Sequence, residues 1–367
     1  MTVKNIDYNR FSLPKLKIFD KALDITIENL KKTIKKLLEA QQNSTLNFDD
    51  FLKLIEQWVF HKHILFIGWN QISWSLSPFM HTYSWYLAWI NILYTLMDVS
   101  GEPEWILDNL LYEIENNSSI LWANITMPYK VKVYEKLKAL WQLDDWALLA
   151  WAVNTISKQN GKIIWFNTDM QWVVWPIQAR LGKDISKICN AYVFWCWWAA
   201  KAAIAGLLKM WISNIHVFNR TPKHLLDISN HFNSEQVRNI LQNSKVERYF
   251  LQLHEYDVSR EENFDISEII IDKWILVNTL PFWFKDNYPK YPIRKEVLEK
   301  IIGNIALYFD VVYDMNYLET PMMSFIQKYK YVPTCDWRDM VIWQAKKWFE
   351  LWTGKEFNLD IIKGMLK

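Results

Sequence analysis

Short apolar runs alternate with helix-like stretches along most of this 367-residue chain. The runs at 63–68, 92–97, 188–194 and 214–218 have the length and the apolar character of buried strands. The stretch at 199–210, rich in Ala and Leu, has the length of a helix. Strands that alternate with helices predict an α/β protein.

The N-terminal part predicts one long amphipathic helix. Between Leu16 and Leu37, apolar residues recur at spacings of three and four, and lysines occupy the other side. Such a helix either docks on the main body or pairs with a second copy as a coiled coil. It carries no recognisable chemistry.

The chain is organised around residues 187–221, which predict a strand, a tight turn, a helix and a second strand. This is half of a dinucleotide-binding fold, in which backbone amides of the turn approach a pyrophosphate. The turn therefore needs residues without side chains, yet it holds Trp195, Cys196, Trp197 and Trp198 before Ala199. Glycines in place of the three indoles would give a phosphate-binding loop of the expected length.

The composition extends this substitution to the whole chain. It contains 8 glycines and 23 tryptophans, which together make up about 8% of the residues, close to the usual glycine share of about 7%. We hypothesise that most Trp letters are glycines in the cell, because UGA codons that encode Gly have been read as Trp. The alternative is a truly Trp-rich protein with an obstructed turn.

Length and charge limit the classes of function. A chain of this length can form two domains with proper cores. The net charge of +2 does not favour nucleic-acid binding. We expect no membrane span and no secretory signal. Cys189, Cys196 and Cys335 lack metal-ligand spacing, so we expect no metal and a cytoplasmic location.

Two segments suggest chemistry without proving it. Ser75 and Ser77, followed by Pro78 at a predicted helix start, suit a loop that presents hydroxyls to a small anion, although serine helix caps are common. Lys130 lies near the start of a helix predicted for 131–143, where the helix dipole disfavours a positive charge. A surface lysine is the alternative.

With Trp read as Gly, five motifs follow one another along the chain: Ser-Leu-Ser-Pro at 75–78, Gly-Ala-Asn-Ile-Thr-Met-Pro-Tyr-Lys at 122–130, Gly-Ala-Val-Asn-Thr at 151–155, Gly-Phe-Asn-Thr-Asp-Met-Gln-Gly at 165–172 and Asn-Arg-Thr at 219–221. This series, in this order, resembles the shikimate dehydrogenase family. The motifs at 278–284, 310–314 and 336–345 agree, and Trp352 falls where the family itself often has Trp. Residues 1–58 lie outside the resemblance, the stretch 224–273 looks long for the family, and Gln71 and Thr82 depart from its pattern.

The resemblance implies roles for individual residues. Lys130 would transfer the hydroxyl proton, and Asp169 would hold and polarise it. The residues implied for the substrate carboxylate and ring hydroxyls are Ser75, Ser77, Thr126, Asn154, Tyr313 and Gln344, with Asp169 again among them. For Thr126 and Asn154, a turn-capping role is the alternative.

The cofactor is implied to be NADP. An NAD-binding fold usually has an acidic residue about 20 positions beyond the turn, but this chain has Asn219, Arg220 and Thr221 there, followed by Lys223. Arg220 can form a fork with a 2′-phosphate. The resemblance adds the turn residues 195–199, together with Asn278, Thr279, Trp337 and Met340, to the cofactor site.

These inferences together predict a two-domain α/β enzyme. We expect a helical extension at 1–58, a substrate-binding domain at 59–165 completed by 336–367, and a doubly wound Rossmann-type NADP domain at 166–335, with the active site between the domains. The implied reaction is the reversible NADPH-dependent reduction of 3-dehydroshikimate. A broader quinate/shikimate dehydrogenase and an inactive binding paralogue are the alternatives. We expect a monomer or homodimer whose only partner is its small-molecule substrate.

Overall fold

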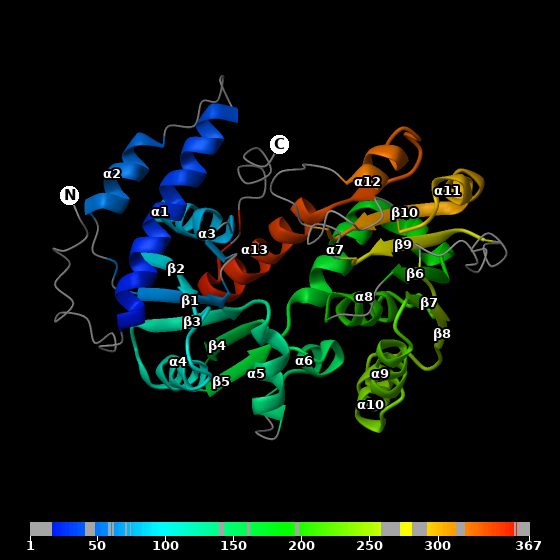
Figure 1. Cartoon of the computed structure of the whole chain (residues 1–367), viewed down its shortest axis with the longest axis horizontal. Helices are drawn as coiled ribbons and strands as arrows, with labels where there is room; N and C mark the ends of the chain where they lie inside the picture. The colour runs from blue at the N-terminus through cyan, green and yellow to red at the C-terminus, as the bar shows by residue number, and fades with distance from the viewer. Residues whose placement is uncertain are drawn as a thin grey trace. The chain divides into compact units, whose positions relative to one another are not determined.

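The computed structural model describes residues 17–40, 48–57, 60, 62–69, 72–73, 75–138, 143–159, 162–194, 198–257, 272–280, 292–312, 320–355 and 357. The chain divides into two compact units. The first unit contains residues 1–147, 152–167 and 345–367, and the second contains residues 148–151 and 168–344. Both units are α/β, as the pattern of apolar runs predicts (Figure 1).

The first unit has a five-stranded mixed sheet in the order β2-β1-β3-β4-β5. Strands β1, β2 and β3 pair in parallel, whereas β3–β4 and β4–β5 are antiparallel. The strands span Lys62–Gly68 (β1), Ile92–Asp98 (β2), Ile120–Ile125 (β3), Thr155–Gln159 (β4) and Lys162–Phe166 (β5). Because β1 is buried along nearly its whole length, it reads in the sequence as a continuous apolar run.

Helices connect and cover this sheet. They span Ser77–Leu87 (α3), Trp105–Asn116 (α4), Tyr129–Leu137 (α5) and Asp145–Ala150 (α6). The helix predicted for 131–143 therefore begins two residues earlier and ends at Leu137. Pro128 occupies the N-cap position of α5. Proline has no backbone N–H, and no such donor is needed where a helix begins, so the helix can start directly after it. It places Lys130 inside the first turn of α5.

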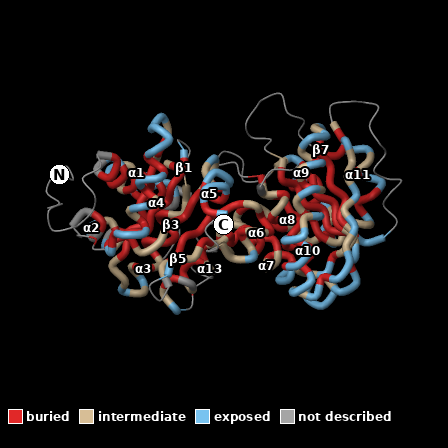
Figure 2. Tube along the Cα trace, turned by 90° about the horizontal axis from the view of Figure 1, so that it is seen from below, coloured by how far each residue is buried: buried red, intermediate tan, exposed pale blue. Residues whose placement is uncertain are grey.

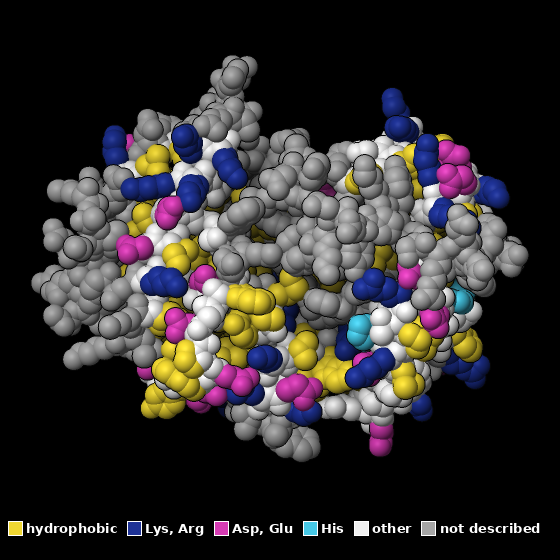
Figure 3. Space-filling model, in the orientation of Figure 1, with side chains coloured by type: hydrophobic (Ala, Val, Ile, Leu, Met, Phe, Trp, Pro, Cys, Tyr) yellow, Lys and Arg dark blue, Asp and Glu magenta, His cyan; other side chains and the backbone are white. Residues whose placement is uncertain are grey.

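The long N-terminal helix is α1 (Lys17–Ala40), followed by α2 (Asp49–Gln57). Helix α1 contacts β2 and α3, so the docked-helix interpretation is confirmed. Its buried face includes Phe19, Leu23, Leu30 and Ile34. Lysine side chains gather over its outer face, as the periodicity predicts (Figure 3).

The second unit has a six-stranded parallel sheet in the order β11-β10-β9-β6-β7-β8. Counted from β6, this is the strand order of the doubly wound dinucleotide-binding fold. The strands span Asn190–Phe194 (β6), Asn214–Asn219 (β7), Phe250–Glu255 (β8), Trp274–Asn278 (β9), Ile305–Asp310 (β10) and Thr334–Cys335 (β11). The strand order reverses between β6 and β9, where such folds bind their ligands.

The helices of this unit span Asp169–Leu181 (α7), Trp198–Lys209 (α8), Pro222–Phe232 (α9), Glu235–Asn243 (α10), Lys295–Ile301 (α11), Pro321–Ile326 (α12) and Trp337–Thr353 (α13). Helix α13 continues from the second unit into the first after Gln344. The central strands β6, β7 and β9 are buried on both faces. Figure 2 shows the buried residues around β7. Among the described residues, no helix is long and apolar enough to span a bilayer.

Candidate functional site

The serine pair lies on a fixed turn at the start of α3. The backbone N–H of Ser77 donates to Oγ of Ser75 across 3.2 Å, and Pro78 follows in the first turn of the helix. Behind the turn, Ser77 hydrogen-bonds the buried Tyr94. Burial raises the pKa of Tyr94 well above its usual value, and this hydrogen bond lowers it in part. The neutral phenol is therefore a lasting donor at this position.

A buried hydrogen-bond network connects the serine turn with Asn154. Oη of Tyr94 donates to Oδ1 of Asn124 across 2.8 Å. Nδ2 of Asn124 donates in turn to the Asn154 carbonyl at 3.3 Å and to Oγ1 of Thr155 at 3.2 Å. The Thr155 hydroxyl donates to Oδ1 of Asn154 across 2.8 Å. Two predicted substrate residues, Ser77 and Asn154, are thus held by one network.

Thr126 and Lys130 lie beyond the carboxyl end of β3, in the same unit. The Thr126 N–H donates to the Ile67 carbonyl, and a Cβ at the neighbouring Gly68 would lie 2.4 Å from the Thr126 methyl group. Only glycine therefore permits this close approach. Lys130 is buried, and its carbonyl accepts from the Val153 N–H next to Asn154. Five predicted site residues are therefore gathered in the first unit.

Asp169 and Gln344 meet in the second unit. Asp169 is fully buried at the first position of α7, where a negative charge is favoured by the helix dipole. Nε2 of Gln344 donates to its Oδ1 across 2.7 Å. A carboxylate and an amide are both groups that bind the hydroxyl groups of a ligand.

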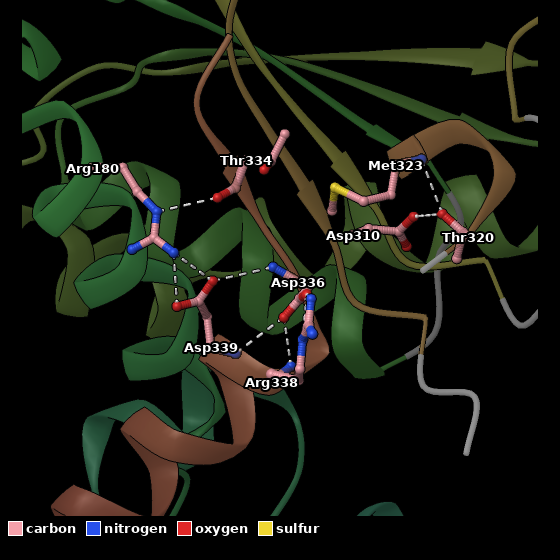
Figure 4. Close-up of polar contacts among 8 residues, drawn as sticks. All are labelled: Arg180, Asp310, Thr320, Met323, Thr334, Asp336, Arg338 and Asp339. Carbon is pink, nitrogen blue, oxygen red and sulfur yellow. Dashed lines mark hydrogen bonds and ion pairs between the residues drawn. The ribbon is translucent and has the colours of Figure 1, made fainter. Parts of the chain in front are cut away.

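A second link joins α7 to the start of α13. Arg180 donates from Nη2 to both carboxylate oxygens of Asp339, at 3.0 and 2.9 Å, and from Nε to the Thr334 carbonyl (Figure 4). Asp336 accepts from the N–H groups of Arg338 and Asp339, so it caps α13. Burial raises the pKa of Asp339, which Arg180 opposes. These contacts fix the helix that carries Gln344.

Buried polar groups surround the carboxyl ends of β6, β9 and β10. The Thr279 hydroxyl donates to the Phe194 carbonyl across 2.7 Å, at the point where the strand order reverses. Nδ2 of Asn278 donates to Asp310 across 3.2 Å, and the Tyr308 and Thr320 hydroxyls donate to the other carboxylate oxygen of Asp310. Burial raises the pKa of Asp310 to about 6, against the effect of these hydrogen bonds. Asp310 therefore holds the predicted cofactor residue Asn278.

The end of β7 offers donors for a phosphate group. Oδ1 of Asn219 accepts from the Thr221 N–H across 2.7 Å. Its Nδ2 is buried without a hydrogen-bond partner among the described residues. Arg220 and Lys223 are exposed beside it. A buried donor without a partner next to two cations fits a phosphorylated ribose, because its desolvation cost would be offset on binding.

Some predicted residues lie outside the described part. They are Trp195, Cys196, Trp197 and Tyr313, and the Trp198 side chain is likewise not described. Ala199 lies in the first turn of α8, and Trp337 and Met340 lie in the first turn of α13. Sequence reasoning missed the roles of Tyr94, Asn124 and Asp310, because a polar letter in an apolar strand does not reveal its partner. No cluster of three metal-ligating residues occurs among the described residues.

Comparison with known proteins identifies relatives of this chain. Residues 67–156 match the family model described as shikimate dehydrogenase substrate binding domain. The shikimate dehydrogenase (NADP(+)) of Methanococcus vannielii is 28% identical over 297 residues, which cover 81% of this chain and 93% of the relative. The enzyme of the same name from Methanocaldococcus jannaschii is 26% identical, with the same two coverages.

Solved structures agree with the fold. A shikimate dehydrogenase crystallised in complex with NADP+ aligns with a TM-score of 0.62 and 26% identity, over 83% of this chain and 94% of that one. This agreement confirms the two-domain α/β fold with a dinucleotide-binding unit. The family model, these relatives and this solved structure all carry the name shikimate dehydrogenase.

Proposed function

We propose that this homologue of the shikimate dehydrogenases catalyses the reversible NADPH-dependent reduction of 3-dehydroshikimate to shikimate. One observation carries the proposal. Ser75, Ser77, Thr126, Lys130 and Asn154 all lie within residues 67–156, the segment that matches the substrate-binding domain, and each of them occupies a loop or the first turn of a helix. A small polyhydroxy acid needs such hydroxyl, amide and amine groups rather than an apolar pocket.

Lys130 and Asp169 are proposed to handle the proton. Oxidation of a secondary alcohol breaks a C–H and an O–H bond; NADP⁺, when bound, supplies the hydride acceptor. The hydroxyl proton passes to Nζ of Lys130, which acts as the general base, and returns from it during reduction. Asp169 acts as its charge partner, with its orientation fixed by Gln344.

The substrate roles follow the chemistry of the side chains. The hydroxyls of Ser75 and Ser77 donate to the carboxylate, and Thr126, Asn154, Asp169 and Gln344 bind ring hydroxyls. Tyr313, outside the described residues, is proposed to complete this set. The Tyr94 and Asn124 network holds Ser77 and Asn154 in place, and preorganised groups lose less entropy when a ligand binds.

NADP is proposed to bind along the carboxyl edge of the second sheet. The orphan Nδ2 of Asn219, with Arg220, Thr221 and Lys223, would hold the 2′-phosphate. The turn at 195–198 and the N-terminus at Ala199 would receive the pyrophosphate. Asn278, Thr279, Trp337 and Met340 would line the nicotinamide side. We place this enzyme in the cytoplasm, as a monomer or homodimer.

We further propose that most Trp letters are glycines in the native protein. Among the described residues, the non-glycine positions with positive φ are Trp89 (58°), Trp151 (52°), Trp211 (65°) and Lys245 (64°). Each of the three tryptophans lies one or two residues beyond the last residue of a helix. For an L-residue with a bulky side chain this backbone region is strained by about 1–2 kcal/mol, whereas glycine adopts it freely.

Hydrogen bonds place Trp89 and Trp211 at the left-handed position that follows a helix C-cap. After α3, the Ile90 N–H donates to the Trp85 carbonyl and the Trp89 N–H to the Tyr86 carbonyl. After α8, Ile212 and Trp211 donate in the same way to Leu207 and Leu208. This is the Schellman motif, whose left-handed residue is usually Gly. Trp89 is 89% exposed and Trp211 66%, so packing does not compensate for the strain.

Buried indoles give independent support. The indole N–H groups of Trp85, Trp122, Trp172, Trp274 and Trp352 are buried without hydrogen-bond partners among the described residues. A buried indole N–H usually finds an acceptor, and an unsatisfied one costs about 1–3 kcal/mol. Trp352 shares this feature, so the feature alone does not decide a position. We retain Trp352, because the resemblance itself supports Trp there, and assign glycine to the other four.

Mass spectrometry of tryptic peptides from the native organism tests the glycine assignment. Peptides that contain positions 89 and 211 should have the masses of the glycine forms. Tryptophan masses at both positions would reject it. The enzymatic proposal is tested separately by turnover of shikimate and of quinate with NADP+ and NAD+. Turnover of shikimate with NADP+ supports it, and equal use of quinate would favour the broader dehydrogenase.

A further inference from the structure

The buried face of α1 contains polar residues that packing alone does not explain. The two most deeply buried of them, Thr26 and Asn29, are 0% and 4% exposed, and they lie beside Thr33, which is 8% exposed, and apolar side chains such as Leu23 and Leu30. A buried polar group costs free energy unless it is hydrogen-bonded, so each of the two needs a specific partner. Their partners differ: one residue attaches the helix to the sheet, and the other contacts the serine turn.

Thr26 attaches α1 to the sheet. Its hydroxyl donates to the Ala22 carbonyl across 2.6 Å and accepts from the Leu96 N–H across 2.8 Å. Leu96 lies in β2, which is the edge strand of the first sheet. The hydroxyl therefore satisfies a backbone donor that a sheet edge leaves open. This contact is purely structural and does not involve the serine turn.

Asn29 reaches the serine turn instead. Its Nδ2 donates to the Ser73 carbonyl across 2.7 Å and to the Ser75 carbonyl across 3.1 Å. The two carbonyls flank position 74, immediately before the serine pair. Within the chain segment itself, the turn has the Ser75 N–H bonded to Ile72 and the Ser77 N–H bonded to Ser75 Oγ. Asn29 therefore adds two bonds from a separate element.

We propose that Asn29 is a positioning residue for the substrate carboxylate, so that the N-terminal extension is part of the working enzyme. This rests on the proposed function of Ser75 and Ser77. With its backbone held from α1, the turn presents both hydroxyls in one arrangement before the substrate arrives. Without Asn29 the turn must be ordered on binding, which weakens substrate affinity. Lys130 and the cofactor residues do not contact Asn29 in the described contacts.

The test compares Asn29→Ala with Thr26→Val in the full-length enzyme. The valine variant removes a buried hydroxyl from the same face of α1 and leaves the serine turn untouched, so it controls for loss of stability. Steady-state kinetics should show that Asn29→Ala raises the KM for shikimate by about tenfold, the effect of losing roughly 1.4 kcal/mol of interaction. The KM for NADP+ should change less than about twofold, and Thr26→Val should leave both values near those of the wild type.

Hydrogen exchange provides a readout that does not depend on activity. Amides of residues 75–77 should exchange faster in Asn29→Ala than in the wild type or in Thr26→Val. An unchanged KM for shikimate in an active Asn29→Ala enzyme would overturn the proposal, as would unchanged exchange of these amides. If the wild type does not turn over shikimate, the proposed function fails, and the exchange data alone still decide whether Asn29 orders the turn.

Discussion

Gln344 donates a hydrogen bond from Nε2 to Oδ1 of Asp169 across 2.7 Å, which joins helix α13 to the first turn of α7. The same two helices are linked again by Arg180 and Asp339. Asp169 is thus a fully buried carboxylate whose orientation is set by an amide. Such a fixed carboxylate suits a role in proton transfer or substrate orientation better than a role in solubility.

The Asp169→Asn variant tests the role of this carboxylate. The substitution keeps the size of the side chain and an oxygen that Gln344 can reach, but it removes the negative charge. We expect kcat to fall by roughly 10²-fold or more, the scale of assisted proton transfer. The variant should retain its unfolding transition in urea. A kcat within about threefold of the wild type would contradict the assignment.

Lys130→Ala should affect turnover far more than substrate affinity. Its amine is proposed to exchange the hydroxyl proton, and general acid–base groups contribute roughly 10²–10⁴-fold to rate. Steady-state kinetics should therefore show a large loss in kcat with little change in KM for shikimate. Lys132→Ala, on the same helix in an exposed ion pair with Glu104, is the matched control and should be nearly silent.

Arg220→Asp should reverse the cofactor preference. The arginine fork is proposed to bind the 2′-phosphate, and an acidic side chain would repel it while accepting ribose hydroxyls. We expect the KM for NADP+ to rise by roughly 10- to 100-fold, with improved use of NAD+. Arg248→Asp makes the same charge change at an exposed position of the same unit and should leave the preference unaltered.

Asp144 predicts a pH-dependent stability. Burial raises its pKa to about 7 from 3.8, although its Oδ1 accepts from the Ala147 N–H across 2.7 Å. The folded state then binds the proton more tightly than the unfolded state. The contribution of Asp144 to stability is therefore fully present below about pH 3.8 and is lost as the pH rises to about 7.

The Asp144→Asn variant tests whether ionisation of Asp144 lowers the stability as the pH rises. Asparagine keeps an oxygen for the Ala147 N–H and cannot ionise. In urea unfolding, the free energy of unfolding of the variant relative to that of the wild type should rise by at least about 1 kcal/mol between pH 4.5 and pH 7.5. If the difference in the free energy of unfolding between the two proteins is constant over this range, the pKa of Asp144 is not raised in the folded state.

The strain at Trp211 makes a prediction for protein expressed with tryptophan as written. Trp211→Gly should raise the free energy of unfolding by about 1 kcal/mol, because glycine adopts positive φ without a clash. Trp105, also exposed but in the first turn of α4, is the matched control. Glycine there should lower stability by roughly 0.5 kcal/mol. Changes of the same sign at both positions would argue against strain at the helix end.

Much of the fold follows from local pattern. β6, α8 and β7 could be predicted, because each is one continuous apolar segment bounded by residues typical of turns. The same holds for α1. The order of the strands in each sheet could not be predicted, because pairs such as β6 and β9 join segments that lie far apart in the sequence.

The site was predictable only as far as motifs carry it. The resemblance identified Ser75, Lys130 and Asn154 as candidates. It did not identify the residues that hold them in place. Tyr94 looked like a core residue of an apolar strand, and its bond to Asn124 depends on the pairing of β1 with β2 and with β3. Asn29 lies in a segment outside every motif, so its contact with the serine turn appeared only in the folded chain.

The most direct measurement is shikimate-dependent reduction of NADP+ by two purified forms of the full chain. One form carries glycine at every Trp position except 352, and the other carries tryptophan as written. We predict that the glycine form reduces NADP+ and strongly prefers it to NAD+, whereas the tryptophan form is inactive because indoles fill the phosphate turn. A glycine form without shikimate-dependent turnover, or a tryptophan form that matches it in rate, would contradict the account.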